Sequence, residues 1–292
     1  MKQILIPVDF GPGSLNSCKY AIEIATKTEP VTLWLFHVYA DQMLYMPSSD
    51  PDGMMADPAL SVEFSEEIRK IAEANMTKLK NEVLAYINNK NYTNFTINEF
   101  MISGDPEWVV QDICDDLNPD GIIMSNEGTG NKSPLEGSMA MRIMGKATVP
   151  VIAVPYQYAN YQFKNVLYAT KLDNEPRDIE AIKTLLKHFK HLDLNIYVIH
   201  FRKSDKSDVS MQLLENAFEK ERLAEKVRFM IVNDDNQTGS TIKAVTTRNE
   251  IDMIAFVAHK THPLKLLFSR GIHKDDFLAT GLPVFGLPPQ KD

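Results

Sequence analysis

The sequence predicts an α/β protein built from two tandem repeats, each a five-stranded parallel sheet with helices on both faces. Three observations predict it. Short apolar segments alternate with longer segments whose apolar residues recur at helical spacing, which is typical of βαβ units. The short segments are apolar throughout, as expected of parallel strands buried on both faces. The order of elements then restarts in the second half of the chain, which indicates a repeat.

The first repeat supplies strands and helices in alternating order. The expected strands are the apolar segments 3–8, 31–39, 93–103, 121–125 and 150–154. Helical spacing of apolar residues predicts helices over 14–28, 63–87, 106–117 and 138–145. We expect Ser14 to cap the first helix, because serine favours the position before a helix. Pro106 suits the first helical position of the third helix.

The second repeat is identified by its similarity to the first. Its segments that resemble strands of the first repeat are 163–173, 193–201, 250–259 and 281–288. Asp120 and Asp252 stand at equivalent positions, 132 residues apart, and Pro150 and Pro283 stand 133 residues apart. We therefore expect one domain over 1–156 and a second, degenerate domain over 163–289.

Residues 41–62 form the clearest difference between the repeats. This segment holds Met43, Met46, Met54 and Met55 and has no apolar periodicity, so we expect a long loop. One interpretation is that its methionines pack on their own domain. The other is that the loop is an adaptable surface for a partner, because Met side chains fit varied surfaces.

Composition excludes several classes of protein. The net charge of −8 argues against general nucleic-acid binding. The charge is uneven: residues 1–155 hold 11 Lys and Arg against 21 Asp and Glu, while residues 156–292 hold 20 against 18. No apolar run is long enough to span a membrane. The N-terminal segment lacks the features of a signal peptide, and only Cys18 and Cys114 are thiols. We therefore expect a cytoplasmic protein.

Three longer segments resemble the universal stress protein family. They are "ILIPVDFGPGSLNSCKYAIEIA" (4–25), "GDPEWVVQDICDDLNPDGIIM" (104–124) and "EGSMAMRIMGKATVPVIAVP" (136–155). The resemblance covers the whole chain but is weaker in the second half. It implies the Rossmann-like fold of adenine-nucleotide α-hydrolases. Family members commonly dimerise through the last strand, so the resemblance implies two halves packed as a pseudo-dimer, with further homodimerisation left open.

The resemblance also implies a candidate nucleotide site in the first half. One family branch binds ATP through a Gly-x2-Gly-x9-Gly-Ser/Thr loop, and another branch lacks this loop and does not bind. By position, Asp9 and Val38 would face the base, and Gly128, Gly137 and Ser138 would face the phosphates. The full set of implied cofactor-binding residues is Pro7, Asp9, Val38, Met124, Gly128, Gly130, Gly137, Ser138 and Met139. The implied cofactor is ATP, with Mg²⁺.

The loop departs from the family motif in three ways. Ser125 stands in place of the first Gly, and eight residues rather than nine separate Gly128 from Gly137. Glu127 adds a carboxylate that weakens phosphate binding unless Mg²⁺ intervenes. Glycines that bring backbone N–H groups to phosphate, followed by a helix N-terminus, still suit an anion. A Gly-rich turn that merely connects strand to helix is the alternative.

The second half departs further from the motif. Lys171 stands where Asp9 stands in the first half, and Gly271 has no Gly pair before it. We expect no nucleotide there. The histidines of the same loop lack the spacing of a metal site: His259, His262 and His273. His37 and His200, at matching ends of two strands, are interpreted as structural.

The predicted function is therefore regulation by binding in the stress response, and not catalysis. ATP is expected in the first domain only. The alternative is a nucleotide-independent interaction module in which both loops are degenerate and an unidentified protein is the partner. A slow ATP hydrolase is the least favoured interpretation, because no general base and no pair of metal-binding carboxylates is evident.

Overall fold

The computed structural model describes residues 1–39, 58–126, 139–170, 174–202, 206–220, 225–233, 238–258 and 280–288. The elements of the first half are β1 (Gln3–Pro7), α1 (Pro12–Ile24), β2 (Val31–Tyr39), α2 (Pro58–Asn89), β3 (Phe95–Ser103), α3 (Pro106–Leu117), β4 (Gly121–Ser125), α4 (Met139–Lys146) and β5 (Val151–Val154). Those of the second half are β6 (Asn165–Ala169), α5 (Glu175–His188), β7 (Asn195–Arg202), α6 (Lys206–Lys220), β8 (Val227–Asn233), α7 (Thr238–Arg248), β9 (Met253–Val257) and β10 (Val284–Leu287). The alternating order predicted from the sequence is confirmed.

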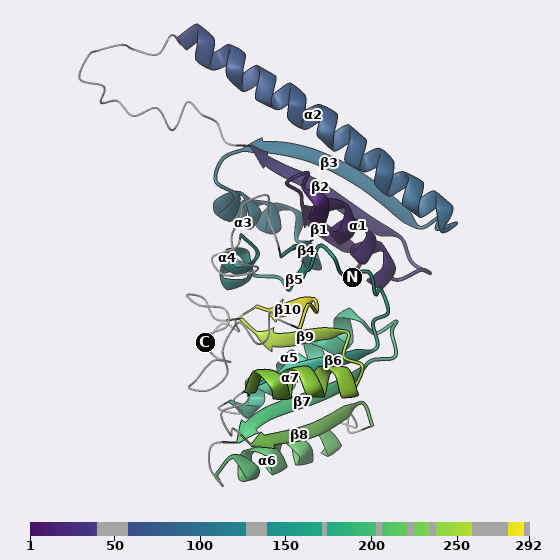
Figure 1. Cartoon of the computed structure of the whole chain (residues 1–292), viewed down its shortest axis with the longest axis vertical. Helices are drawn as coiled ribbons and strands as arrows, with labels where there is room; N and C mark the ends of the chain where they lie inside the picture. The colour runs from purple at the N-terminus through teal and green to yellow at the C-terminus, as the bar shows by residue number, and fades with distance from the viewer. Residues whose placement is uncertain are drawn as a thin grey trace, which may run out of the picture.

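The strands of both halves form one continuous sheet (Figure 1). Its order is β3-β2-β1-β4-β5-β10-β9-β6-β7-β8. Strands within each half pair in parallel, whereas β5 and β10 pair antiparallel, with Ile152 opposite Phe285. The last strand of each half therefore joins the two sheets about a pseudo-two-fold axis, as the pseudo-dimer interpretation expects.

The helices cover both faces of this sheet. One cluster of buried side chains contains residues of α1, α2, α5 and α6, and the other contains residues of α3, α4 and α7. Equivalent helices of the two halves thus lie on the same face. Figure 1 shows α2 running along β3 and continuing beyond it.

Asp120 and Asp252 make the same pair of hydrogen bonds in the two halves. The carboxylate of Asp120 accepts from the backbone N–H groups of Lys2 and Gln3, at the start of β1. The carboxylate of Asp252 accepts from the backbone N–H groups of Lys164 and Asn165, at the start of β6, both at 2.9 Å. The equivalence that sequence spacing predicted is therefore confirmed by geometry.

We expect Asp120→Asn to remove part of the pH dependence of stability. Burial raises the pKa of Asp120, but the hydrogen bonds from Lys2 and Gln3 outweigh it, so the pKa lies below its ordinary value. A depressed carboxyl pKa contributes stability above the unfolded pKa of about 4, and this contribution is lost as the pH falls through the folded pKa. Denaturant unfolding at pH 7 and at pH 3 should show a smaller acid loss in Asp120→Asn than in the parent. An equal loss in both would contradict the assignment.

Two helix starts differ from the sequence expectation. The first helix begins at Pro12, with Gly11 at its N-cap and without a side-chain cap, so the prediction that Ser14 caps it is wrong. Proline fits the first turn of a helix and moves its start upstream. For the same reason α2 begins at Pro58, so the end of the expected loop 41–62 is helical. Residues 40–57, with all four methionines of that segment, lie outside the described residues.

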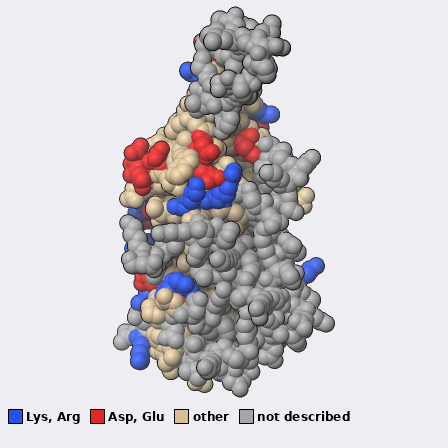
Figure 2. Space-filling model, turned by 90° about the vertical axis from the view of Figure 1, so that its left-hand side faces the viewer, with Lys and Arg blue, Asp and Glu red and all other residues tan. Residues whose placement is uncertain are grey.

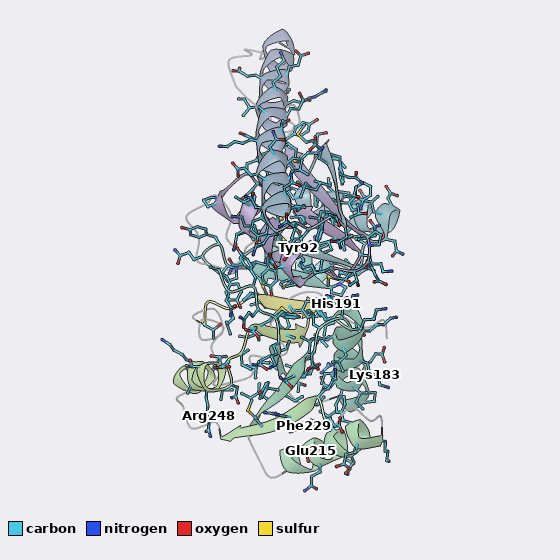
Figure 3. All side chains as sticks on the ribbon, turned by 90° about the vertical axis from the view of Figure 1, so that its right-hand side faces the viewer. Tyr92, Lys183, His191, Glu215, Phe229 and Arg248 are labelled. Carbon is cyan, nitrogen blue, oxygen red and sulfur yellow. The ribbon has the colours of Figure 1, made fainter. Side chains whose placement is uncertain are left out.

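Further contacts tie the halves together beside the sheet. Asn16 of α1 donates to the carbonyls of Pro155 and Tyr158 at 3.0 Å and accepts from the hydroxyl of Tyr161 at 2.8 Å. His191, near the boundary of the two halves in Figure 3, bonds through Nε2 to the carbonyl of Ile24 at 2.8 Å. Partly buried polar contacts therefore add to the sheet pairing between the two halves.

Candidate functional site

The predicted base-binding residues lie together at the carboxyl ends of the strands of the first-half sheet. Pro7 ends β1, Val38 lies near the end of β2, Met124 lies near the end of β4, and Met139 opens α4. Val38, Met124 and Met139 all pack in the cluster on the α3 and α4 face. The structure thus brings together residues that are far apart in the sequence.

The carboxyl ends of β1 and β4 form a topological switch point of the sheet. Strands β1 and β4 are parallel neighbours, yet α1, which follows β1, and α4, which follows β4, cover opposite faces. The crevice between the carboxyl ends of two such strands is where open α/β sheets bind ligands. The predicted site therefore lies where the topology favours one.

Asp9 closes the turn between β1 and α1. Its Oδ1 accepts from the N–H of Gly11 at 2.9 Å and from the hydroxyl of Ser14 at 2.8 Å. Ser14 Oγ in turn accepts from the N–H of Asp9 at 3.1 Å. Asp9 is exposed, and its Oδ2 has no hydrogen-bond partner among the described residues. The carboxylate is thus oriented through one oxygen and free to bind through the other.

Phe10 and His37 brace the same turn. Phe10 adopts a φ of +60°, in the left-handed region, and its ring centroid lies 4.4 Å from that of His37. Nδ1 of His37 lies 2.7 Å from the carbonyl oxygen of Val8 and donates to it, because a carbonyl oxygen can only accept. The structural role predicted for His37 is confirmed, whereas the side chain of His200 lies outside the described residues.

A groove lies on the other side of this turn. It has a volume of about 360 Å³ and lies between the start of α1 and α2. Phe10, Leu15 and Leu79 give it apolar walls, and Asn75 and Glu82 add polar groups. Its size is at the lower end of small-molecule sites.

Gly13 allows α1 to sit directly on the end of β4. A Cβ built at Gly13 would lie 2.1 Å from Oγ and 2.6 Å from Cβ of Ser125, far inside van der Waals contact. The first turn of α1 therefore approaches β4 as closely as it does only because residue 13 has no side chain. Ser125, the residue that departs from the family motif, is the one that fills this space.

Asn126 follows β4 and is buried at the switch point. Its backbone N–H donates to the carbonyl of Val154 at 3.0 Å, and its side chain is 5% exposed. No described residue donates a hydrogen bond to its side-chain oxygen Oδ1. Sequence reasoning missed this residue, because an Asn between a strand and a Gly-rich segment is typical of an ordinary turn.

Helix α4 is fixed to α3 by Glu107. The Glu107 carboxylate pairs with Arg142 at 2.8 Å and with Lys146 at 2.5 Å, and the Lys146 ammonium lies 4.5 Å from the centroid of Trp108. Figure 2 shows acidic and basic side chains adjoining on this face of the first half. Asp105 caps α3 by accepting from the N–H of Glu107 at 2.8 Å. Capping thus explains Asp105, as predicted, whereas Glu107 also positions the helix that follows the Gly-rich segment.

The second half carries a buried carboxylate beside the end of its first strand. Asp178 of α5 is 1% exposed. It accepts from the hydroxyl of Tyr168 at 2.8 Å and from that of Thr170 at 2.9 Å. Tyr168 belongs to β6 and Thr170 follows it directly. The carboxylate of Asp178 therefore connects α5 to the end of β6.

Several predicted residues lie outside the described part of the chain. They are Gly128, Gly130, Gly137 and Ser138 of the Gly-rich segment, together with Lys171, His259, His262, His273 and Gly271 of the second half. Their roles remain predictions from the sequence.

Comparison with known proteins gives a family and a fold. The sequence model of the universal stress protein family matches residues 1–155. No curated protein matches the chain. A universal stress protein from Archaeoglobus fulgidus is similar in structure, with a TM-score of 0.62 and 16% identity, covering 99% of this chain and 97% of that chain. A protein of unknown function from Pseudomonas aeruginosa PAO1 has a TM-score of 0.55 and 12% identity, covering 99% and 93%.

These similarities span both halves. At such identities they show the fold alone, which is the two-repeat α/β architecture predicted from the sequence. Among the described helices, none is long and apolar enough to cross a membrane.

Proposed function

Because the chain belongs to the universal stress protein family, we propose that it is a stress-response regulator that binds ATP, with Mg²⁺, in its first half only. The observation that carries this proposal is the arrangement at the switch point between β1 and β4. There, one oxygen of Asp9 is held by the turn and the other is free. The apolar side chains of Val38 and Met124 lie near the carboxyl ends of β2 and β4. An apolar wall and an oriented acceptor suit a purine base.

The asymmetry between the halves supports binding in the first half only. In the second half, Lys171 stands where Asp9 stands in the first, so the carboxylate that would face a base is absent from that position. The first half instead continues from Asn126 into a segment with Gly128, Gly137 and Ser138, whose glycines allow close approach of phosphate to backbone N–H groups.

We propose a regulatory role without catalysis. Asp9 is the acid of the described site, and one of its carboxylate oxygens already accepts hydrogen bonds within the turn. It is therefore a positioning group and a poor general base. Glu127 precedes Gly128 in the sequence, and Mg²⁺ would screen its charge from the phosphates. Nucleotide occupancy, rather than turnover, would then be the signal that the protein reports.

Isothermal titration with Mg-ATP tests the proposal. We expect micromolar binding to the purified chain and its loss in Gly137→Asp, because the new carboxylate meets the phosphates. Asn89→Asp adds the same charge at an exposed position at the end of α2, on the far side of the sheet, and should bind as the parent does. Absence of heat at high concentrations of parent protein and ATP would refute nucleotide binding.

A nucleotide-independent interaction module is the second candidate, and one observation favours it. Trp108 on α3 is 61% exposed. An exposed Trp favours a partner surface, because aromatic residues are enriched where proteins bind partners. Lys146 lies over its ring, so the surface presents an aromatic group beside a cation. If the titration shows no ATP binding, this surface is where a protein partner should be sought.

A further inference from the structure

A cavity of about 390 Å³ lies between the two halves, at the amino ends of β1 and β4. Its first-half wall includes Thr26 and Glu29, which follow α1, and Asp120, which precedes β4. Its second-half wall is formed by α5 and the segment that follows this helix. The site proposed for ATP lies at the carboxyl ends of the same strands, so the cavity is a separate place in the fold.

The second-half wall carries three lysines. Lys183 and Lys187 are one turn apart on α5, and Lys190 follows the helix. Side chains four residues apart lie on the same face of a helix, with about 5–6 Å between their Cβ atoms. Figure 3 shows Lys183 on this helix and His191 closer to the first half. The wall therefore presents neighbouring positive charges to the cavity.

The carboxylates of the cavity are largely engaged by groups of the first half. Asp120 accepts from the backbone N–H groups of Lys2 and Gln3. Glu29 pairs with the Lys2 ammonium at 3.5 Å. The remaining acid of the lining, Glu180 of α5, is exposed. Most of the negative charge is thus already compensated without the lysines of α5.

The lysines at the end of α5 are available to a ligand. Lys187 and Lys190 are exposed, and no ion pair joins either of them to a residue that the structure describes. The carbonyl of Lys187 accepts from the N–H groups of Phe189 and Lys190, which reduces the repulsion that a helix C-terminus exerts on an anion. The bond from His191 Nε2 to the carbonyl of Ile24 holds this segment against the first half.

The lining also indicates the chemistry of the ligand. Among the described residues that line the cavity, Met1 alone has an apolar side chain. The cavity therefore lacks the apolar wall that holds a base or another hydrophobic group. Lysine ammonium groups bind phosphate as point charges. Charges one helical turn apart suit a ligand that carries more than one phosphate group.

We infer that this cavity binds a small anion with two or more phosphate groups, held between the two halves by Lys187 and Lys190. Condensed inorganic phosphates and sugar bisphosphates share this chemistry. Because walls from both halves meet in the cavity, a bound anion stabilises the packed pair of domains. The inference is independent of the proposed function, since the two sites lie at opposite ends of the strands.

Isothermal titration of the full chain with tripolyphosphate and with fructose-1,6-bisphosphate, at an ionic strength of about 0.15 M, tests the inference. The probe that binds more tightly identifies the source of the phosphate groups. For that probe we expect Lys187→Gln/Lys190→Gln to bind about tenfold more weakly than the parent. Lys220→Gln/Lys243→Gln removes two exposed charges from α6 and α7 of the same half and should bind as the parent does.

Other outcomes would overturn the inference. Equal weakening by the two lysine pairs would show that the anion responds only to overall charge. Absence of heat with both probes would show that the cavity binds no such phosphate. Loss of probe binding in Gly137→Asp, with binding retained in Lys187→Gln/Lys190→Gln, would assign the anion to the Gly-rich segment instead.

Mg-ATP separates this inference from the proposed function. Lys187→Gln/Lys190→Gln should keep the parent's affinity for Mg-ATP, and Gly137→Asp should keep the parent's affinity for the probe. If the parent binds the probe in a manner that depends on Lys187 and Lys190 but does not bind Mg-ATP, the proposed function fails and the inference stands.

Discussion

Gly13→Ala should lower the free energy of unfolding by about 3 kcal/mol, although alanine ordinarily stabilises a helix relative to glycine. The new Cβ would meet Oγ of Ser125 at 2.1 Å and its Cβ at 2.6 Å. Rotation of the serine hydroxyl relieves only the first contact, so α1 must move away from β4. Denaturant unfolding followed by fluorescence measures the loss.

The double variant Gly13→Ala/Ser125→Gly is the control for this mechanism. It removes both atoms that the new Cβ would meet, so in the Ser125→Gly background we expect Gly13→Ala to cost under about 1 kcal/mol. Equal costs in the two backgrounds would show that the contact between α1 and β4 is not what constrains residue 13. Because the turn that holds Asp9 precedes α1, Gly13→Ala should also weaken Mg-ATP binding.

Phe285→Ala should lower the free energy of unfolding by about 4 kcal/mol and should destabilise the first half as well as the second. Phe285 is fully buried in β10 and pairs with Ile152 of β5, across the junction of the two sheets. Its ring lies edge-on to that of Phe189, with 5.7 Å between centroids. Deleting the ring therefore opens a cavity at the junction.

The two tryptophans make this prediction measurable. Trp34 and Trp108 are the only tryptophans, and both lie in the first half, so fluorescence reports the unfolding of that half, whereas far-UV circular dichroism reports both. Phe285→Ala should shift both transitions. Phe218→Ala deletes an equally buried ring of α6 beside Phe229, far from the junction, and should shift the fluorescence transition much less. A fluorescence transition unmoved by Phe285→Ala would contradict the coupling of the halves through β5 and β10.

The secondary structure was largely predictable from the sequence because its signals are local. The expected strands 31–39 and 121–125 and the expected helix 106–117 match β2, β4 and α3. Continuous apolar runs, helical spacing and a proline in the first turn depend on residues within a few positions of one another. Where the local signal was ambiguous, as at Ser14 and Pro58, the predicted helix starts were wrong.

The candidate site was predictable only in part. The family resemblance predicted Pro7, Val38, Met124 and Met139 as site residues. The structure brings them together at the carboxyl ends of the strands. The resemblance did not reveal the close approach of Gly13 to Ser125, or the buried oxygen of Asn126 to which no described residue donates a hydrogen bond. Each of these features depends on the distance between two packed elements, which a sequence pattern does not predict.

The sequence by itself determined that this chain is a tandem α/β repeat and where its strands other than β8 (Val227–Asn233) lie, since apolar runs and helical periodicity are local properties of the chain. The family resemblance implied that the last strands pair, and the tertiary structure decided that β5 and β10 pair antiparallel and join the two sheets into one. It also decided that Asp178 of α5 accepts from Tyr168 of β6 and that Glu107 pairs with Arg142 and Lys146 of α4. These features rest on contacts between elements that are apart in the chain. Such contacts depend on packing distance and buried charge, which leave no periodic pattern in the sequence.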